Sequence, residues 1–109
     1  MNKLVLDGVV ASIEPLRYTP AGIPLLSFVV QHVSDQIEGG MKRKVECVLN
    51  AVALGNITSD TALKAVKIGD QVEVTGFLAK RSLKSTQLVM HINAISLKNS
   101  EQKLGVYNG

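Results

Sequence analysis

The chain has 109 residues, of which 46% are hydrophobic and 19% charged, and its formal net charge is +3. This length suits one domain with one core, and this composition excludes a wholly disordered segment. No uninterrupted apolar run approaches the roughly 20 residues that span a bilayer, and the N-terminus lacks the pattern of a secretory signal. The only cysteine, Cys47, has no partner for an internal disulfide. We therefore expect a cytoplasmic protein that does not associate with membranes.

The first part of the chain predicts two strands. Residues 3–13 are rich in β-forming residues and carry Gly8 in the interior, where a strand bends sharply or bulges. Such a bend lets one strand serve two sheets of a small barrel. Prolines and a glycine mark a connecting loop over residues 15–24. A second strand follows, and its alternation places Phe28 in the core.

Residues 34–40 read as a polar loop that ends in Gly39 and Gly40. The third strand follows it and alternates, so that Cys47 lies on one face with apolar neighbours and Glu46 lies on the other. We therefore expect a buried Cys47 thiol and an exposed Glu46. A run of three cations leads into this strand: Lys42, Arg43 and Lys44.

Residues 51–67 are the only candidate for a helix, with Thr58, Ser59 or Asp60 available as the N-cap. Five strands with a short helix or turn between the third and the fourth give the element order of an all-β, five-stranded Greek-key barrel, the OB-fold. The sheet face and loops of this fold bind oligonucleotides. We expect the OB-fold domain to span residues 1–98 and residues 99–109 to form a flexible C-terminal tail.

The segment from Gln71 to Leu97 predicts the last two strands, and the connection between them carries three cations. Residues alternate between two faces through both strands, with Leu88, Met90, Ile92 and Ala94 on one face of the second. Residues 74–100 contain no carboxylate. A cluster of like charges destabilises a fold unless an anion binds it, and the simplest such anion is a phosphodiester backbone. The cations of this connection are Lys80, Arg81 and Lys84.

Aromatic side chains are scarce. The chain has no Trp, two Tyr and two Phe, whereas single-strand binding usually combines a cationic groove with aromatic platforms. Tyr18, in the loop beside Arg17, is the best stacking candidate. Phe77 lies opposite the face of Val72, Val74 and Leu78, and both a core position and a stacking platform stay open for it. His91 alternates with apolar neighbours on the sheet. We therefore expect electrostatic contacts with the DNA backbone to dominate binding.

Several segments resemble a known family. Residues 4–10, 19–24 and 72–77 are similar to strand signatures of bacterial single-stranded DNA-binding proteins. The similarity extends over residues 3–97, nearly the whole chain. Within that family the resemblance narrows to the primosomal replication protein N (PriB) family. The residues that carry it are Pro15, Leu16, Arg17, Pro20, Gly22, Ile23, Pro24, Phe28, Val29, His32, Cys47, Gly76, Phe77, Met90 and His91.

The resemblance implies a homodimeric OB-fold protein that binds single-stranded DNA and helps to reload replication proteins at stalled forks. The implied protein partners are the PriA helicase and other primosome proteins. It also implies DNA contacts by Lys80, Arg81 and Lys84, because the family places its DNA-contacting lysines in this loop. Met41 and Glu46 stand where family members can present aromatic residues. We therefore expect weak DNA binding, with the helicase interaction carrying more of the function.

Two other functions stay open. One is a general single-stranded DNA-binding protein, which should carry a long tail with an acidic tip; the other is an OB-fold protein-interaction module whose basic loops meet an acidic protein surface. No catalytic, zinc-binding or nucleotide-binding motif is visible, so we expect no enzyme, cofactor or metal. The predicted DNA-binding residues are Arg17, Tyr18, Lys42, Arg43, Lys44, Lys80, Arg81 and Lys84.

Overall fold

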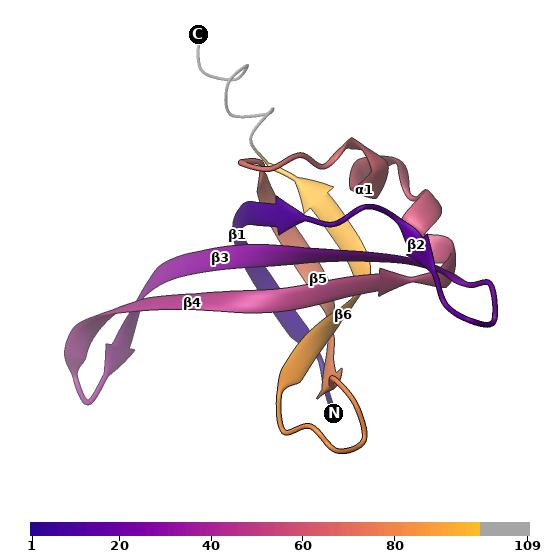
Figure 1. The fold of residues 1–109 in the computed structure, drawn as a ribbon. Helices are drawn as coiled ribbons and strands as arrows, with labels where there is room; N and C mark the ends of the chain where they lie inside the picture. The colour runs from indigo at the N-terminus through magenta and orange to yellow at the C-terminus, as the bar shows by residue number, and fades with distance from the viewer. Residues whose placement is uncertain (99–109) are drawn as a thin grey trace, which may run out of the picture.

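The computed structural model describes residues 1–98 (Figure 1). The predicted tail over residues 99–109 lies outside this range. Among the described residues, no helix is long and apolar enough to span a membrane. The elements in chain order are β1 (Leu4–Ile13), β2 (Arg17–Tyr18), β3 (Pro24–Glu38), β4 (Met41–Leu54), the 3-10 helix η1 (Gly55–Ser59), α1 (Thr61–Ala65), β5 (Gln71–Lys80) and β6 (Leu88–Leu97).

The strands form a closed barrel. Their order is β1-β5-β6-β4-β3-β2, and a further pairing between β1 and β3 closes the sheet. Neighbours pair in antiparallel fashion except β4 and β6, which are parallel. This is the five-stranded OB-fold barrel that the sequence predicted, with β2 added as a short strand beside β3. Arg17 and Tyr18 therefore lie in a strand paired with Leu25 and Pro24, and the loop predicted for them is wrong.

Strand β1 closes the barrel because it is shared between two neighbours. It pairs with β5 from Leu4 to Val9 and with β3 from Val9 onward, and its register with β3 shifts between Val10 and Ser12. At Gly8, β1 and β3 come so close that a Cβ built on Gly8 would lie 2.3 Å from the Gln31 carbonyl oxygen. The predicted irregularity is present, although the register shift itself follows Gly8.

The core fills the barrel from every main strand and from α1. Phe28 is 2% exposed, as predicted. Leu63 of α1 is equally buried, and its helix begins at Asp60, whose carboxylate accepts hydrogen bonds from the backbone nitrogens of Ala62 and Leu63. The core residues are Val10, Phe28, Val30, Ala51, Ala53, Leu63, Val66, Val72, Val74, Met90 and Ile92.

The predicted helix over residues 51–67 is partly wrong. Residues 51–54 continue β4, and the helical turns begin only at Gly55. Ala51 and Ala53 are buried between strands, so their small side chains fit the close packing of the barrel rather than a helix face. Of the three N-cap candidates, Asp60 is the one that caps α1.

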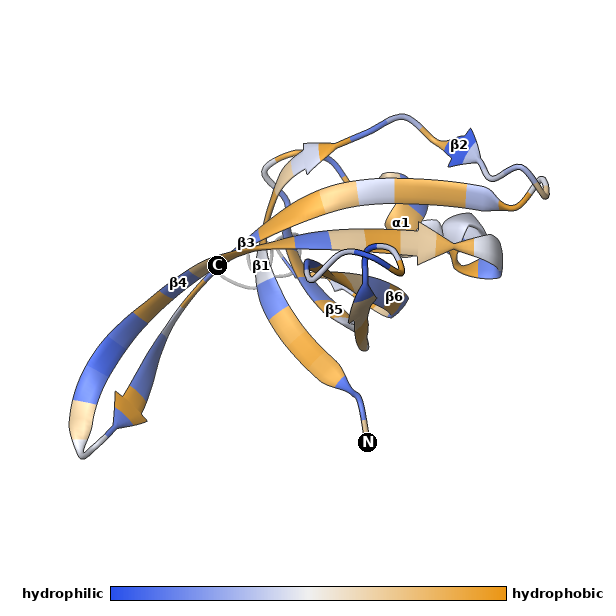
Figure 2. Cartoon of the chain, turned by 60° about the horizontal axis from the view of Figure 1, so that its bottom comes forward, coloured by the Kyte–Doolittle hydropathy of each residue, from blue (hydrophilic) through white to orange (hydrophobic). Residues whose placement is uncertain are grey.

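Strands β3 and β4 continue beyond the barrel as a long hairpin, which we call the arm (residues 33–46; Figures 1 and 2). The polar loop predicted over residues 34–40 is wrong, because pairing extends to Glu38↔Met41. Gly39 and Gly40 alone form the turn, with φ of 62° and 78°, as a two-residue hairpin turn requires. Opposite charges across the arm support it, since Lys42 and Arg43 pair with Asp35 and Glu38.

Cys47 is exposed, so the predicted buried thiol is wrong. It pairs with His32 where the hairpin leaves the barrel. Cys47 does lie on the same face of β4 as Val45 and Leu49, but this face extends beyond the end of the barrel core. Alternation predicts a common face, whereas burial requires another element to cover that face.

Strand β6 contains a bulge that changes the face of its second half. Gly76 pairs with Ile92 and Thr75 with Ala94, so Asn93 has no partner on β5. Beyond the bulge Ile95 packs against the core, whereas Ala94 is exposed. The alternation predicted for Met90, Ile92 and Ala94 therefore holds only as far as Ile92.

Candidate nucleic-acid interface

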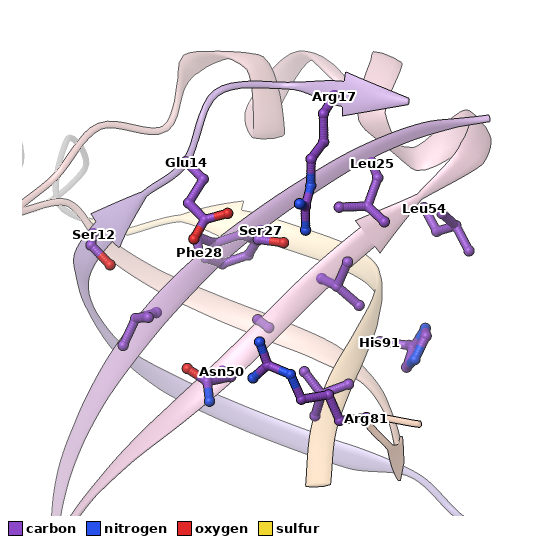
Figure 3. A pocket seen from close by; sticks show the side chains of 14 residues that line it. Ser12, Glu14, Arg17, Leu25, Ser27, Phe28, Asn50, Leu54, Arg81 and His91 are labelled. Carbon is purple, nitrogen blue, oxygen red and sulfur yellow. The ribbon is translucent and has the colours of Figure 1, made fainter. Parts of the chain in front are cut away.

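A groove of about 450 Å³ lies on the outer face of β3 and β4 (Figure 3). One side is formed by the end of β1 and by β2, and the other by the connection between β5 and β6. The residues that line it include Ser12, Glu14, Arg17, Leu25, Ser27, Val29, Asn50, Val52, Leu54, Arg81, Val89 and His91.

The floor of the groove follows from strand alternation. Residues paired across β3 and β4 share a face, so Ser27 lies opposite Val52, and Val29 opposite Asn50. The neighbouring positions Phe28 and Ala51 point into the core. The floor thus combines apolar surface, which suits sugars and base faces, with hydroxyl and amide groups, which suit base edges.

Two arginines reach the groove from opposite sides. In Figure 3 the side chain of Arg17 approaches from β2 and that of Arg81 from the β5–β6 connection, with β3 and β4 between them. Neither guanidinium forms an ion pair with a carboxylate within residues 1–98. Unpaired guanidinium groups bind phosphates through strong, charge-assisted hydrogen bonds. Glu14 also lines the groove, and its negative charge opposes phosphate binding there.

Backbone hydrogen bonds hold the segments that carry both arginines. Beyond β2, the Thr19 nitrogen donates to Ile23 O over 2.9 Å and the Gly22 nitrogen donates to Thr19 O over 2.8 Å. In the β5–β6 connection the Arg81 nitrogen donates to Gln87 O over 2.9 Å. Preorganised segments lose less conformational entropy when a ligand binds.

The other predicted residues near these segments do not line the groove. Lys80 and Lys84 belong to the same connection as Arg81, and Lys80 Nζ donates to the Leu83 carbonyl over 3.0 Å. Tyr18 is 64% exposed and follows Arg17 in a strand, where successive side chains point to opposite faces. The predicted DNA contacts of these three residues stay predictions.

The cations from Lys42 to Lys44 lie on the arm, away from the residues that line the groove. Each forms an ion pair: Lys42 with Asp35 over 3.7 Å, Arg43 with Glu38 over 2.6 Å, and Lys44 with Glu46 over 3.4 Å. Exposed ion pairs of this kind contribute about 0–1 kcal/mol. They hold the arm together only weakly, and the cations keep solvent access for an anionic ligand.

The sequence reading missed the polar floor of the groove, chiefly Ser27 and Asn50. A signal for Asn50 was present, because it alternates with Leu49 and Ala51. The alternation places Asn50 on the outer face with Glu46, but the groove over that face forms only where β2 and the β5–β6 connection lie beside it.

Comparison with known proteins defines the class. Residues 2–94 match the family described as another single-strand binding protein family, and the chain belongs to it. The single-stranded DNA-binding protein of Thermus aquaticus has the same fold, with a TM-score of 0.71 at 21% identity over 90% of this chain and 50% of that chain.

Closer relatives specify the branch. Replication restart protein PriB of Nitrosomonas europaea is 38% identical over 93 residues, which cover 84% of this chain and 82% of that protein. The structure of PriB from Ralstonia solanacearum has a TM-score of 0.76 and 31% identity, over 89% of this chain and 97% of that chain. The chain is thus a member of the replication restart protein PriB family, which confirms the resemblance seen in the sequence.

Proposed function

We propose that this protein binds single-stranded DNA in the groove between Arg17 and Arg81 and acts as an accessory protein of replication restart. The observation that carries the proposal is the pair of unpaired guanidinium groups on either side of an OB-fold sheet face. Family membership supports it, because the relatives are named single-strand binding and replication restart proteins. The proposed action is binding without catalysis, in the cytoplasm, where bacterial replication takes place.

Phosphates would contact Arg17 and Arg81, and the apolar and polar floor would contact sugars and bases. Lys80 and Lys84 extend the cationic surface along the β5–β6 connection. The groove lining contains two aromatic rings, of which Phe28 is 2% exposed and His91 is half-buried, so binding would depend on phosphates more than on stacking.

A titration of fluorescently labelled oligo-dT tests this function. We expect binding that weakens as salt rises, and weaker binding to a duplex of the same length, whose bases cannot reach the floor. A lack of binding at low salt would contradict the proposal and favour a protein-interaction module.

We further propose a homodimer, with a PriA-type helicase and other primosome proteins as partners. The dimer proposal is supported by the N-terminal half of β1. Pairing with β3 begins only at Val9, and His32 of β3 reaches the Asp7 carbonyl, so one edge of β1 from Leu4 to Leu6 lacks a neighbouring strand within residues 1–98. The apolar Val5 on this segment is 52% exposed. A second copy pairing along this edge would satisfy its backbone groups.

Light scattering tests the assembly. At protein concentrations of tens of micromolar we expect the mass of two chains of 11.7 kDa each. Val5→Glu should shift the protein toward the monomer, because a charge on an apolar edge opposes pairing. A monomer mass for the unsubstituted protein would contradict the homodimer.

Glu46 offers a test of whether DNA runs from the groove onto the arm. It shares the outer face with Val48 and Asn50 and lies about 13 Å along the strand from Asn50, at roughly 3.3 Å per residue. Its side chain is 66% exposed, as predicted. We expect Glu46→Trp to tighten oligo-dT binding several-fold, since one stacked base contributes about 1–3 kcal/mol.

The matched control is Glu46→Gln, which removes the charge that pairs with Lys44 without adding an aromatic ring. Fluorescence anisotropy should show a smaller gain for this variant than for Glu46→Trp. Equal affinities for the two variants would mean that the gain is purely electrostatic, and no gain for either would place the DNA elsewhere.

A further inference from the structure

A partly exposed aromatic pair lies at the edge of the groove. Phe77 on β5 and His91 on β6 are cross-strand partners, and their rings stack with centroids 5.1 Å apart and an interplanar angle of 4°. At this centroid distance parallel rings are offset, so neither ring covers the other completely. Phe77 is 41% exposed, whereas the core aromatic Phe28 is 2% exposed.

The pair continues the floor of the groove across the sheet. Ser27 pairs with Val52, Val52 with His91, and His91 with Phe77, so these residues form one row over four adjacent strands. Side chains in such a row share a face. His91 lines the groove and also a neighbouring hollow of about 330 Å³, to which Phe77 contributes. The aromatic pair therefore lies where the two depressions meet.

The bulge in β6 gives this hollow a polar edge. Asn93, the residue without a partner on β5, lines the hollow, as does Asn56 from η1. Neither side-chain amide has a hydrogen-bond partner among residues 1–98. Gly76 allows β5 to lie close to β6, since a Cβ on Gly76 would lie 1.8 Å from His91 O. Bulges commonly redirect side chains toward binding sites.

We propose that the Phe77–His91 pair is a stacking platform for one nucleobase of the bound strand, with the amides of Asn56 and Asn93 placed to hydrogen-bond its edge. A planar ring that carries donors and acceptors on its edge fits this combination of an open aromatic stack and unpaired amides. The subsite rests on the proposed function, because it extends the path of the same strand from the groove across β6.

The test compares Phe77→Leu with the unsubstituted protein on two oligonucleotides of equal length, oligo-dT and an abasic strand. Leucine keeps an apolar side chain but removes the ring. We expect roughly tenfold weaker binding to oligo-dT, the effect of losing one stacked base, and little change on the abasic strand. Ile68→Ala is the control, because Ile68 is 65% exposed and lines neither depression.

A second variant reports stacking directly. Since the chain has no Trp, Phe77→Trp introduces a single fluorophore at the platform. Its emission should be quenched by oligo-dT and much less by the abasic strand, and its affinity for oligo-dT should rise.

The outcomes separate the subsite from the proposed function. Normal oligo-dT binding by Phe77→Leu, or equal quenching of Phe77→Trp by both strands, would overturn the subsite alone and leave a cross-strand pair that merely stabilises the sheet. A failure of the unsubstituted protein to bind either strand would overturn both.

Discussion

Gly76→Ala is expected to destabilise the barrel by about 3 kcal/mol, the upper end of what overpacking costs in a well-packed interior. The added Cβ would lie 1.8 Å from His91 O and 2.8 Å from the His91 carbonyl carbon. Both are backbone atoms of β6, so no side-chain rotation can relieve the overlap. Thermal unfolding should shift down by roughly 12–24 °C, because about 1 kcal/mol corresponds to 4–8 °C in a domain of this size.

Gly22→Ala is the matched control. Gly22 has a φ of 83° but no atom within 4 Å of a built Cβ, so the substitution adds backbone strain without overlap. We expect a loss of about 1–2 kcal/mol. Equal melting temperatures for the two variants would show that the close approach of β5 and β6 does not determine stability.

Removing both groove arginines should produce the largest loss of DNA affinity. Arg17→Ala combined with Arg81→Ala deletes the guanidinium groups on either side of the floor. Each charge-assisted hydrogen bond contributes about 1.5–3 kcal/mol, and roughly 1.4 kcal/mol corresponds to tenfold in affinity. We therefore expect the dissociation constant for oligo-dT to rise about a hundredfold in a fluorescence-anisotropy titration.

A control variant with the same change in net charge distinguishes contacts made in the groove from the general attraction between a cationic protein and DNA. Lys64→Ala combined with Lys67→Ala removes two cations that do not line the groove. This pair should weaken binding only slightly at moderate salt, because screening limits attraction over a Debye length of about 10 Å. Equal losses for the two double variants would contradict binding in the groove.

The period-2 alternation of the strands made most of the barrel predictable. It placed Phe28 in the core and Phe77 on the face opposite Val72 and Val74, and both placements are confirmed. The bulge at Asn93 was not predictable, because it arises where β5 and β6 must approach closely at Gly76. The polar composition of the arm did not predict strands, because backbone pairing holds these strands together without a buried apolar face and the exposed ion pairs add only weakly.

The sequence predicts individual site residues, but it does not predict how these residues lie relative to one another. Arg17 and Arg81 are far apart in sequence, and only closure of the barrel brings both to the same groove. The cations from Lys42 to Lys44 coincide with the third strand, a binding-face element of this fold. The structure places them on the arm, beyond the barrel, and their DNA contacts stay predictions. Long-range strand pairing decides which loops meet, and the alternation within one strand does not identify its partner strands.

The dependence of DNA affinity on salt tests the central claim that phosphates are held by the cations on either side of the groove. For the unsubstituted protein, a plot of log affinity for oligo-dT against log salt should have a slope of about −1.5 to −3, since each neutralised phosphate contributes roughly 0.7. The triple variant Lys80→Ala, Arg81→Ala and Lys84→Ala should flatten that slope and weaken binding. An unchanged slope with unchanged affinity would contradict the account and place the DNA on another surface.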